Sequence, residues 1–169
     1  MGCFAARSWV DVTSTMKAFK VLATVAMVVV LGGCATGPDF KSYQAEIGSP
    51  QSNQARIWIY RPRVAFSTAA EPDVYINNVK VGRALTSGCF YCDRPAGHYE
   101  VQCGTQRTDK AYLILTNNQV QFVRLRGAPG IGTLMVGVSV GHVVPETVTA
   151  EEAAPEIATC RHFEEKSKN

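Results

Sequence analysis

The sequence predicts a mainly β fold, an antiparallel β-sandwich that ends in a short C-terminal helix. Three observations support this fold class: short runs rich in β-branched and aromatic residues, turn-forming residues at close spacing between them, and one helix signal near the C-terminus. About seven or eight short strands fit the pattern. No alternation of strands with helices is visible, which disfavours a doubly wound nucleotide-binding fold.

The first two strand signals are the clearest. Residues 56–61, RIWIYR, alternate, with the isoleucines and the last arginine on one face and the tryptophan and tyrosine on the other, and Pro62 ends the strand or marks a sheet edge. Residues 73–82, DVYINNVKVG, place Asn77 and Asn78 between two β-rich runs. Because asparagine tolerates the left-handed conformation of a tight turn, this segment predicts a β-hairpin.

A second asparagine pair predicts another hairpin. Asn117 and Asn118 join a strand over 112–116 to a strand over 119–125.

A third hairpin is predicted over residues 88–104, GCFYCDRPAGHYEVQCG. Pro95 suits the first central position of a type I turn, and Gly97 can take a positive φ, so a three-residue loop with a bulge is expected. The resulting register sets Arg94 opposite His98, Asp93 opposite Tyr99, Tyr91 opposite Val101, and Cys89 opposite Cys103.

The C-terminal part adds one apolar segment and the helix. Residues 133–144, TLMVGVSVGHVV, favour a buried strand, with a small-residue helix lying on a membrane as the alternative. Residues 147–160 begin with a capping-type Thr149 followed by acidic residues, which predicts a short helix interrupted near Pro155 and packed on the end of the sheet.

The N-terminal segment predicts secretion. Its apolar stretch, residues 21–31, is about 17 Å long as a helix, against a hydrocarbon core of about 30 Å. Lys17 and Lys20 precede this stretch and small residues follow it, as in a secretory signal peptide. Because residues 1–15 fit no part of such a signal, we expect translation to start at Met16. An ordinary cleaved leader and a retained membrane anchor are the alternatives.

The end of this leader, LGGC at 31–34, closely resembles the lipobox of bacterial lipoproteins. The resemblance implies that Cys34 becomes the first mature residue and carries diacylglycerol, a covalent lipid rather than a cofactor. Several acyl chains make a lasting membrane anchor. The residue after Cys34 is Ala35. An aspartate at this position would resemble an inner-membrane retention signal, so the alanine favours an outer-membrane lipoprotein facing the periplasm over an inner-membrane one.

These boundaries divide the chain into a signal peptide (1–33), a lipidated N-terminus with a flexible tether (34–54), a β-sandwich domain (55–163) and a polar tail (164–169). From residue 34 onward there are 14 basic and 13 acidic residues, a net charge of +1, whereas the full chain carries +3. A nearly neutral chain without a cationic run argues against nucleic-acid binding.

The domain also resembles a family of bacterial lipoproteins that carry a compact β-domain of unassigned function. The matching segments are ARIWIYRPR (55–63), DVYINNVKVGRAL (73–85) and GCFYCDRPAGHYEV (88–101), the last of which is similar to the proline-glycine hairpin of PEGA repeats. The resemblance implies an immunoglobulin-like or prealbumin-like sandwich on the envelope, with no enzyme chemistry to carry over.

Four cysteines lie in the predicted domain: Cys89, Cys92, Cys103 and Cys160. An even number in an oxidising compartment predicts two disulfides. The predicted register favours pairing Cys89 with Cys103, because cross-strand neighbours have the Cα separation that a disulfide accepts, and this leaves Cys92 for Cys160. The alternatives are a redox CxxC at 89–92 and a zinc site that adds His98 to the first three cysteines.

No catalytic grouping is evident in the sequence. His98, His142 and His162 are scattered, Asp93 near His98 lacks a third partner, and no nucleophile elbow or phosphate-binding glycine motif occurs. The aromatic residues recur at strand positions and fit a packed core, although an exposed subset can bind sugar or peptide.

We therefore expect a lipid-anchored, non-catalytic envelope module with a structural role or an envelope protein or glycan as its partner. The first alternative is a periplasmic thiol-redox or metal-binding protein that uses Cys89, Cys92 and Cys103. A weaker alternative is a membrane-active protein that inserts residues 133–144 into lipid.

Overall fold

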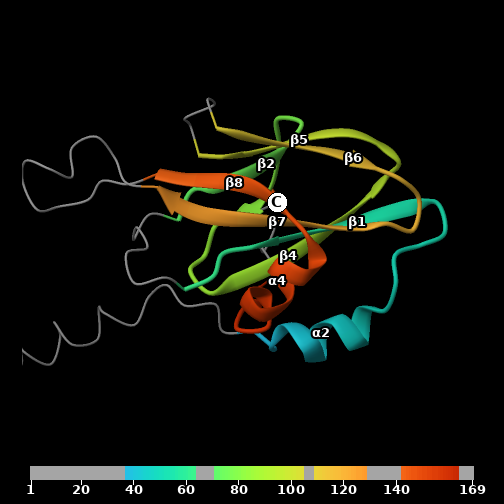
Figure 1. The fold of residues 1–169 in the computed structure, drawn as a ribbon, viewed down its shortest axis with the longest axis horizontal. Helices are drawn as coiled ribbons and strands as arrows, with labels where there is room; N and C mark the ends of the chain where they lie inside the picture. Colours follow the sequence, from blue (N-terminus) through green and yellow to red (C-terminus); the bar gives the residue numbers. More distant parts are fainter. Residues whose placement is uncertain (1–36, 64–70, 105–108, 129–141, 164–169) are drawn as a thin grey trace, which may run out of the picture. The chain divides into compact units, whose positions relative to one another are not determined.

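A computed structural model describes residues 37–63, 71–104, 109–128 and 142–163 (Figure 1). These residues form two β-sheets and two short helices. The five-stranded sheet has the order β8-β7-β1-β4-β9, and the four-stranded sheet has the order β3-β2-β5-β6. Their bounds are β1 (Gln54–Tyr60), β2 (Asp73–Ile76), β3 (Val79–Arg83), β4 (Gly88–Pro95), β5 (Gly97–Cys103), β6 (Lys110–Leu115), β7 (Val120–Ala128), β8 (His142–Val148), β9 (Arg161–His162), α2 (Phe40–Ile47) and α4 (Ala150–Ile157).

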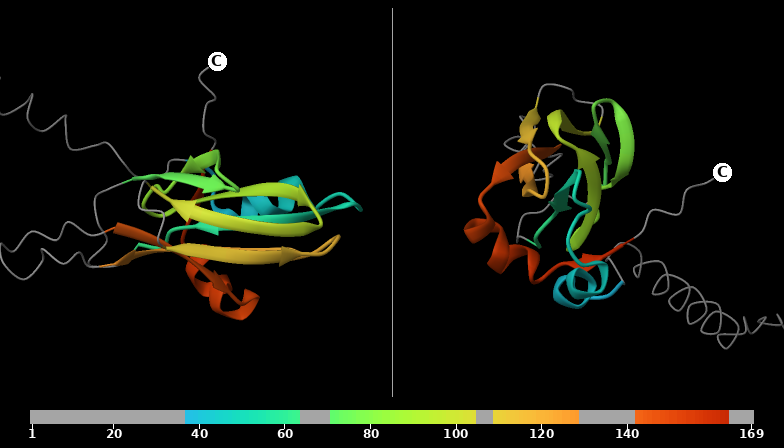
Figure 2. Two further views of the ribbon diagram at one scale, coloured as in Figure 1. Left: turned by 90° about the horizontal axis from the view of Figure 1, so that it is seen from above. Right: turned by 90° about the vertical axis from the view of Figure 1, so that its right-hand side faces the viewer.

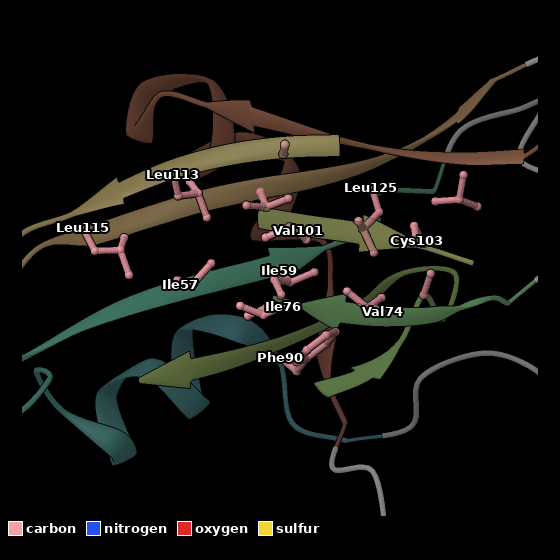
Figure 3. Packing of buried hydrophobic residues seen from close by; sticks show 14 of the residues in the cluster. Ile57, Ile59, Val74, Ile76, Phe90, Val101, Cys103, Leu113, Leu115 and Leu125 are labelled. Carbon is pink, nitrogen blue, oxygen red and sulfur yellow. The ribbon is translucent and has the colours of Figure 1, made fainter. Parts of the chain in front are cut away.

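The two sheets pack face to face, as the end-on view in Figure 2 shows, which confirms the predicted mainly β sandwich with a C-terminal helix. Side chains from both sheets meet in one core, for example Ile57 and Ile59 from the first sheet and Val101 and Leu113 from the second (Figure 3). All four are at most 3% exposed. The alternation that the sequence showed at 56–61 is the physical cause, because every second side chain of a strand reaches the same face.

Strand β1 lies in the middle of the first sheet. It pairs antiparallel with β4 and parallel with β7, so the sheet is mixed rather than purely antiparallel. Residues 55–60 are all buried. Just past the strand, Arg61 is also buried, and its guanidinium donates a hydrogen bond of 2.7 Å to the carbonyl oxygen of Ala84.

One predicted hairpin is confirmed and two are wrong. Strands β2 and β3 form the hairpin predicted at Asn77 and Asn78, which take positive φ angles of 49° and 65°. Strand β4 instead pairs with β1 and β9, while β5 pairs with β2 and β6, so the register predicted across residues 88–104 does not exist. Likewise β6 and β7, on either side of Asn118, belong to different sheets. Turn residues specify a reversal of the chain, but pairing depends on which strand edge lies nearest in the folded domain.

A second buried cluster lies on the other face of the first sheet, beneath the helices. Trp58 and Tyr60 of β1 point into it, opposite in direction to the isoleucines of the same strand. Helix α2 covers Trp58 with the ring of Phe40, at a centroid distance of 4.8 Å in an edge-on arrangement. Asp39 caps this helix by accepting the backbone N–H of Ser42. The helix falls within residues 34–54, for which the sequence predicts a flexible tether.

Helix α4 packs on this face as well. Thr149 and Glu152 form a reciprocal capping box, which confirms the predicted start of the helix. The helix is not interrupted at Pro155 but continues to Ile157. Ala153 and Ile157 are fully buried against the sheet, and this burial holds the short helix in place despite the backbone N–H that proline lacks.

A half-buried polar cluster joins α4 to the sheet. The hydroxyl of Tyr60 donates a hydrogen bond of 2.6 Å to Glu156, which also accepts one of 2.8 Å from Arg124. Arg124 in turn pairs with Glu146 on β8. Burial, together with the hydrogen bond to Glu156, raises the pKa of Tyr60.

We predict that Tyr60→Phe lowers the free energy of unfolding at pH 7 by about 1 to 3 kcal/mol, because it leaves Glu156 with one partner fewer. The raised pKa of Tyr60 means that this contribution is complete below the ordinary tyrosine pKa of 10.0 and declines as pH rises beyond it. Urea denaturation at pH 7 and pH 10.5 measures both effects. Tyr112→Phe is the matched control, because Tyr112 is 68% exposed. Equal stability of Tyr60→Phe and the parent at pH 7 would contradict the prediction.

Candidate functional site: a groove along the open edge of β4

The most distinctive feature of the sandwich is a strand edge of β4 that is largely unpaired within the described residues. One edge of β4 pairs with β1 along its whole length. Its other edge pairs with β9 at only two positions, Gly88 with Arg161 and Cys89 with His162. From Phe90 onward, no strand in the described part of the chain pairs with this edge. A strand edge of this kind offers backbone donors and acceptors to another extended segment.

The hydrogen-bonding pattern identifies which backbone groups of β4 face outward. The N–H of Arg61 donates to the carbonyl oxygen of Gly88, so Gly88 and every second residue after it face β1. Cys89 faces the other way, because its carbonyl oxygen accepts the N–H of Phe163. By the same alternation, Tyr91 and Asp93 direct their N–H and C=O groups away from β1 and toward the open edge.

A groove with a volume of about 440 Å³ follows this edge. Tyr91 and Asp93 line it from the helix-covered face of β4, and Phe90 and Cys92 line it from the inner face, so the groove straddles the strand. Its other walls come from β3, α2 and the end of β9. The lining residues are Tyr43, Val81, Gly82, Phe90, Tyr91, Cys92, Asp93, Arg94, His162 and Phe163.

Aromatic rings form the walls of the groove. Tyr43 of α2 stacks on the buried imidazole of His162 with ring centroids 3.5 Å apart and an interplanar angle of 11°. Phe90 meets Phe163 edge-on at 5.2 Å. A Cβ atom on Gly82 would lie 2.7 Å from the ring of Phe90, so glycine at this position of β3 leaves the space that the ring occupies.

A buried arginine fixes the shape of the groove floor. Arg56 of β1 is 4% exposed and binds both carboxylate oxygens of Asp93, at 2.7 and 2.8 Å. Its third hydrogen bond, of 2.6 Å, reaches the carbonyl oxygen of Gly48 at the end of α2. The guanidinium also lies 4.2 Å from the centre of the Tyr91 ring, and the hydrogen bond to Asp93 raises the pKa of Arg56. Arg56 therefore connects β1, β4 and α2 in one bonded unit.

The charge of the groove follows from this arrangement. The carboxylate of Asp93 is already neutralised by Arg56. Within the described residues, the guanidinium of Arg94 donates one hydrogen bond, to the main-chain oxygen of Asp93, and pairs with no carboxylate. The groove thus combines aromatic walls, outward-facing backbone groups and one cationic side chain. This composition suits binding of an extended chain with an apolar or acidic character.

The four cysteines of the predicted disulfides are free thiols in this structure. Cys89 and Cys160 belong to the cluster beneath the helices, whereas Cys103 lies in the core between the sheets and Cys92 packs against that core. Each predicted partner pair is therefore divided by the first sheet. The register that favoured Cys89 with Cys103 is wrong because β4 and β5 belong to different sheets.

The thiol environment also bears on the redox alternative. Cys89 and Cys92 are three positions apart on a strand, so their side chains point to opposite faces and cannot act as a vicinal dithiol. Burial raises the pKa of Cys92 and Cys160 to about 11, and that of Cys89 and Cys103 to about 12. Reactive thiols have lowered pKa values, because the thiolate is the nucleophile.

The three histidines and the predicted zinc ligands are also separated. His98 is exposed on β5, His142 bonds Asp109 at 2.9 Å, and His162 is buried in the groove wall. Asp93 binds Arg56 rather than His98. Within the described ranges, no three histidine, cysteine or acidic side chains gather as metal ligands, so the set of Cys89, Cys92, Cys103 and His98 is not brought together.

Three predicted segments lie outside the described residues: the leader together with Cys34, residues 133–141 of the apolar segment, and the polar tail over 164–169. Residues 142–144 form the start of β8. Among the helices that the structure describes, none has the length and apolar character needed to cross a membrane.

Comparison with known proteins gives a family for the strands that build the groove. A family of proteins of unknown function, DUF2846, matches residues 51–137. The chain belongs to the DUF2846 family. The matched segment covers β1 to β7, and therefore the β3 and β4 walls of the groove, while α2 and β9 lie outside it. No curated protein and no solved structure matches the chain.

We predict that Arg56→Ala destabilises the domain by about 3 to 5 kcal/mol, because it leaves Asp93 without the charge that compensates its partial burial. Urea denaturation measures the loss. A double-mutant cycle with Asp93→Ala should show that the two substitutions are strongly non-additive. The control is Arg83→Ala, whose ion pair with Glu71 is half exposed and should change stability by about 0.5 kcal/mol or less. Additive effects of Arg56→Ala and Asp93→Ala would contradict this account.

We also predict slow alkylation of Cys92 in the folded protein. With a pKa near 11 rather than 9.0, its thiolate fraction at pH 8 is about 100-fold lower than in the unfolded chain. Iodoacetamide labelling followed by peptide mass spectrometry measures the rate, and Cys92→Ser gives the background. An alkylation rate that levels off near pH 7 would instead indicate an activated, redox-type thiol.

Proposed function

We propose that this DUF2846 protein is a lipid-anchored, non-catalytic module of the bacterial envelope that binds an extended segment of a partner envelope protein. The partner segment would add to the open edge of β4, in the groove between β3, β4 and α2. The observation that carries this proposal is the outward direction of the backbone groups of Tyr91 and Asp93 beside the groove.

Strand addition fits the groove for three reasons. Backbone groups at a strand edge supply hydrogen bonds without requiring a particular partner sequence. Strand β9 already pairs with the first two residues of β4, so a bound segment would continue an existing sheet. Flanking aromatic rings and Arg94 provide side-chain contacts on either side of the bound backbone, and such contacts give selectivity.

A protein partner is favoured over a glycan by these backbone groups. Sugar recognition relies chiefly on polar side chains placed around an exposed aromatic ring, whereas here Tyr43 and Phe90 face other rings of the same domain. The carboxylate of Asp93 is held by Arg56 and is not available to bind sugar hydroxyls.

The non-catalytic assignment rests on the chemistry of the groove. Cys92 has a raised pKa and packs against the core between the sheets, whereas His162 is buried and stacks on Tyr43, which packs against the cluster beneath the helices. A nucleophile needs an adjacent base and a lowered pKa, and this pair supplies neither feature. A redox CxxC would require Cys89 and Cys92 to act as a dithiol, which their opposite orientations on the strand do not allow.

The anchor part of the proposal rests on residues 31–34, LGGC, at the end of the apolar leader. Acylation at Cys34 would attach the mature chain to the outer membrane, facing the periplasm. Only five residues separate Cys34 from the start of α2 at Phe40, so the domain would lie close to the lipid surface.

Site-specific photocrosslinking in living cells tests the binding proposal. A photoreactive residue replaces Val81 in the groove wall, and the matched control replaces Ile114, which is 65% exposed on β6 of the same sheet. We expect a crosslinked protein of defined mass from the Val81 position only. Adducts that contain glycan instead of protein, equal adducts at both positions, or no adduct at either would contradict the proposal.

Lipidation is tested by the Cys34→Ala variant of the full chain. We expect the parent protein to incorporate labelled fatty acid and to fractionate with the outer membrane, and the variant to lose the label. Mass analysis of the mature N-terminus should find an acylated residue 34. A parent protein that begins at another residue, or that lacks fatty acid, would overturn the anchor.

A further inference from the structure

The described part of the chain places two of its cysteines in one buried cluster. Cys89 on β4 and Cys160, which follows α4, are 0% and 1% exposed and both belong to the cluster beneath the helices. Cys89 is the register partner of Tyr60. The thiol of Cys160 donates to the carbonyl oxygen of Arg61, the next residue of the chain, at 3.7 Å. The two side chains therefore pack on the same end of β1.

Backbone pairing joins the chain segments that carry Cys89 and Cys160. Arg161, which follows Cys160, pairs with Gly88, which precedes Cys89. The N–H of Arg161 donates to Ser87, so the segment that carries Cys160 is bonded to the segment that carries Cys89. Ionisation of Cys160 raises the pKa of Cys89, in addition to the larger effect of burial, which is consistent with their proximity.

The other two cysteines have different surroundings. Cys92 points to the inner face of β4 beside Ile57, and Cys103 pairs with Val74 in the second sheet. The first sheet lies between each of these thiols and the pair formed by Cys89 and Cys160.

We propose that Cys89 and Cys160 form a disulfide in the mature protein, while Cys92 and Cys103 remain thiols. This proposal rests on the envelope location given above, since oxidising compartments support disulfides. A dithiol-disulfide oxidant protein would accept the two electrons. One cysteine thiolate attacks the disulfide of the oxidant, which releases one oxidant thiolate and forms a mixed disulfide. The second cysteine thiolate then attacks the sulfur of the first cysteine, and the other oxidant thiolate leaves. The products are the new S–S bond and the oxidant in its dithiol form, which takes up the two protons that the cysteine thiols lose.

The disulfide would have a defined structural role. It would tie β4 to the segment between α4 and β9, and thereby hold β9 at the beginning of the open edge. Because both sulfur atoms are buried in the folded domain, oxidation would precede the final packing of α4 on the sheet.

Mass mapping tests the disulfide. The chain from residue 34 onward, carrying Cys34→Ala, is secreted into the periplasm of an expression bacterium behind a heterologous leader, trapped with iodoacetamide without reduction, and digested with trypsin and chymotrypsin, which together separate Cys89 from Cys92. We expect a linked pair of peptides containing Cys89 and Cys160, with Cys92 and Cys103 alkylated after denaturation. Reduction should lower the urea midpoint of unfolding.

Two variants keep the test decisive. Cys92→Ser combined with Cys103→Ser should retain the link, and Cys160→Ser should abolish it and leave Cys89 open to alkylation after denaturation. Alkylation of Cys89, Cys92, Cys103 and Cys160 together in the secreted parent, or a link that involves Cys92 or Cys103, would overturn the proposal. Because the heterologous leader fixes the compartment, a failure of native lipidation or localisation is detected separately, by the Cys34→Ala experiment, and leaves this result unaffected.

Discussion

The double-sided burial of strand β1 is the constraint on which the rest of the domain depends. A strand between two neighbours in a sheet exposes two faces, and both faces of β1 are covered, one by the second sheet and the other by α2 and α4. Burying aliphatic side chains on one face and Trp58 and Tyr60 on the other removes a large apolar area from water. This arrangement requires β4 and β7 beside β1, and it therefore draws β4 away from β5.

The groove is a consequence of the same arrangement. Once β4 is paired with β1 on one edge, its other edge needs a partner, and β9 supplies one for only two residues. The Arg56 guanidinium then fixes Asp93, Tyr91 and the end of α2 relative to β1, so the walls of the groove are held by buried contacts. A rigid aromatic cleft beside a strand edge that the described strands leave largely unpaired is well suited to recognise an extended chain, because little ordering is needed on binding.

Much of the fold was predictable from local pattern. The alternation at 56–61, the Asn77-Asn78 turn and the capping box at Thr149 each depend on neighbouring residues, and each is confirmed. The assignment of strands to sheets was not predictable in this way. The turns after β4 and β6 look like hairpin turns locally, but their strands separate because β1 competes for the edges of β4 and β7 over a long sequence distance.

The site was harder to predict than the fold. Backbone N–H and C=O groups are common to all residues, so no sequence motif marks the ones at the open edge. The walls of the groove come from segments as distant as Tyr43 and Phe163. Helix α2 was missed because its sequence is rich in polar residues, and Phe40 is the one buried residue of the helix. The Asp-x-x-Ser spacing at Asp39 was the available signal for its start. The orientation of the cysteines followed from sheet assignment, so the error in the β4–β5 register carried directly into the predicted pairing.

The most direct test of the central claim, that β4 presents an open edge to the groove, is residue-resolved amide hydrogen exchange of the folded domain by NMR. The N–H groups of Phe90 and Cys92 face β1 and should be strongly protected, whereas those of Tyr91 and Asp93 face the groove and should exchange much faster. Strong and uniform protection of all four amides would contradict the account, because the edge would then be paired. Protection of Tyr91 and Asp93 alone would also contradict it, because these two amides, and not those of Phe90 and Cys92, would then face β1.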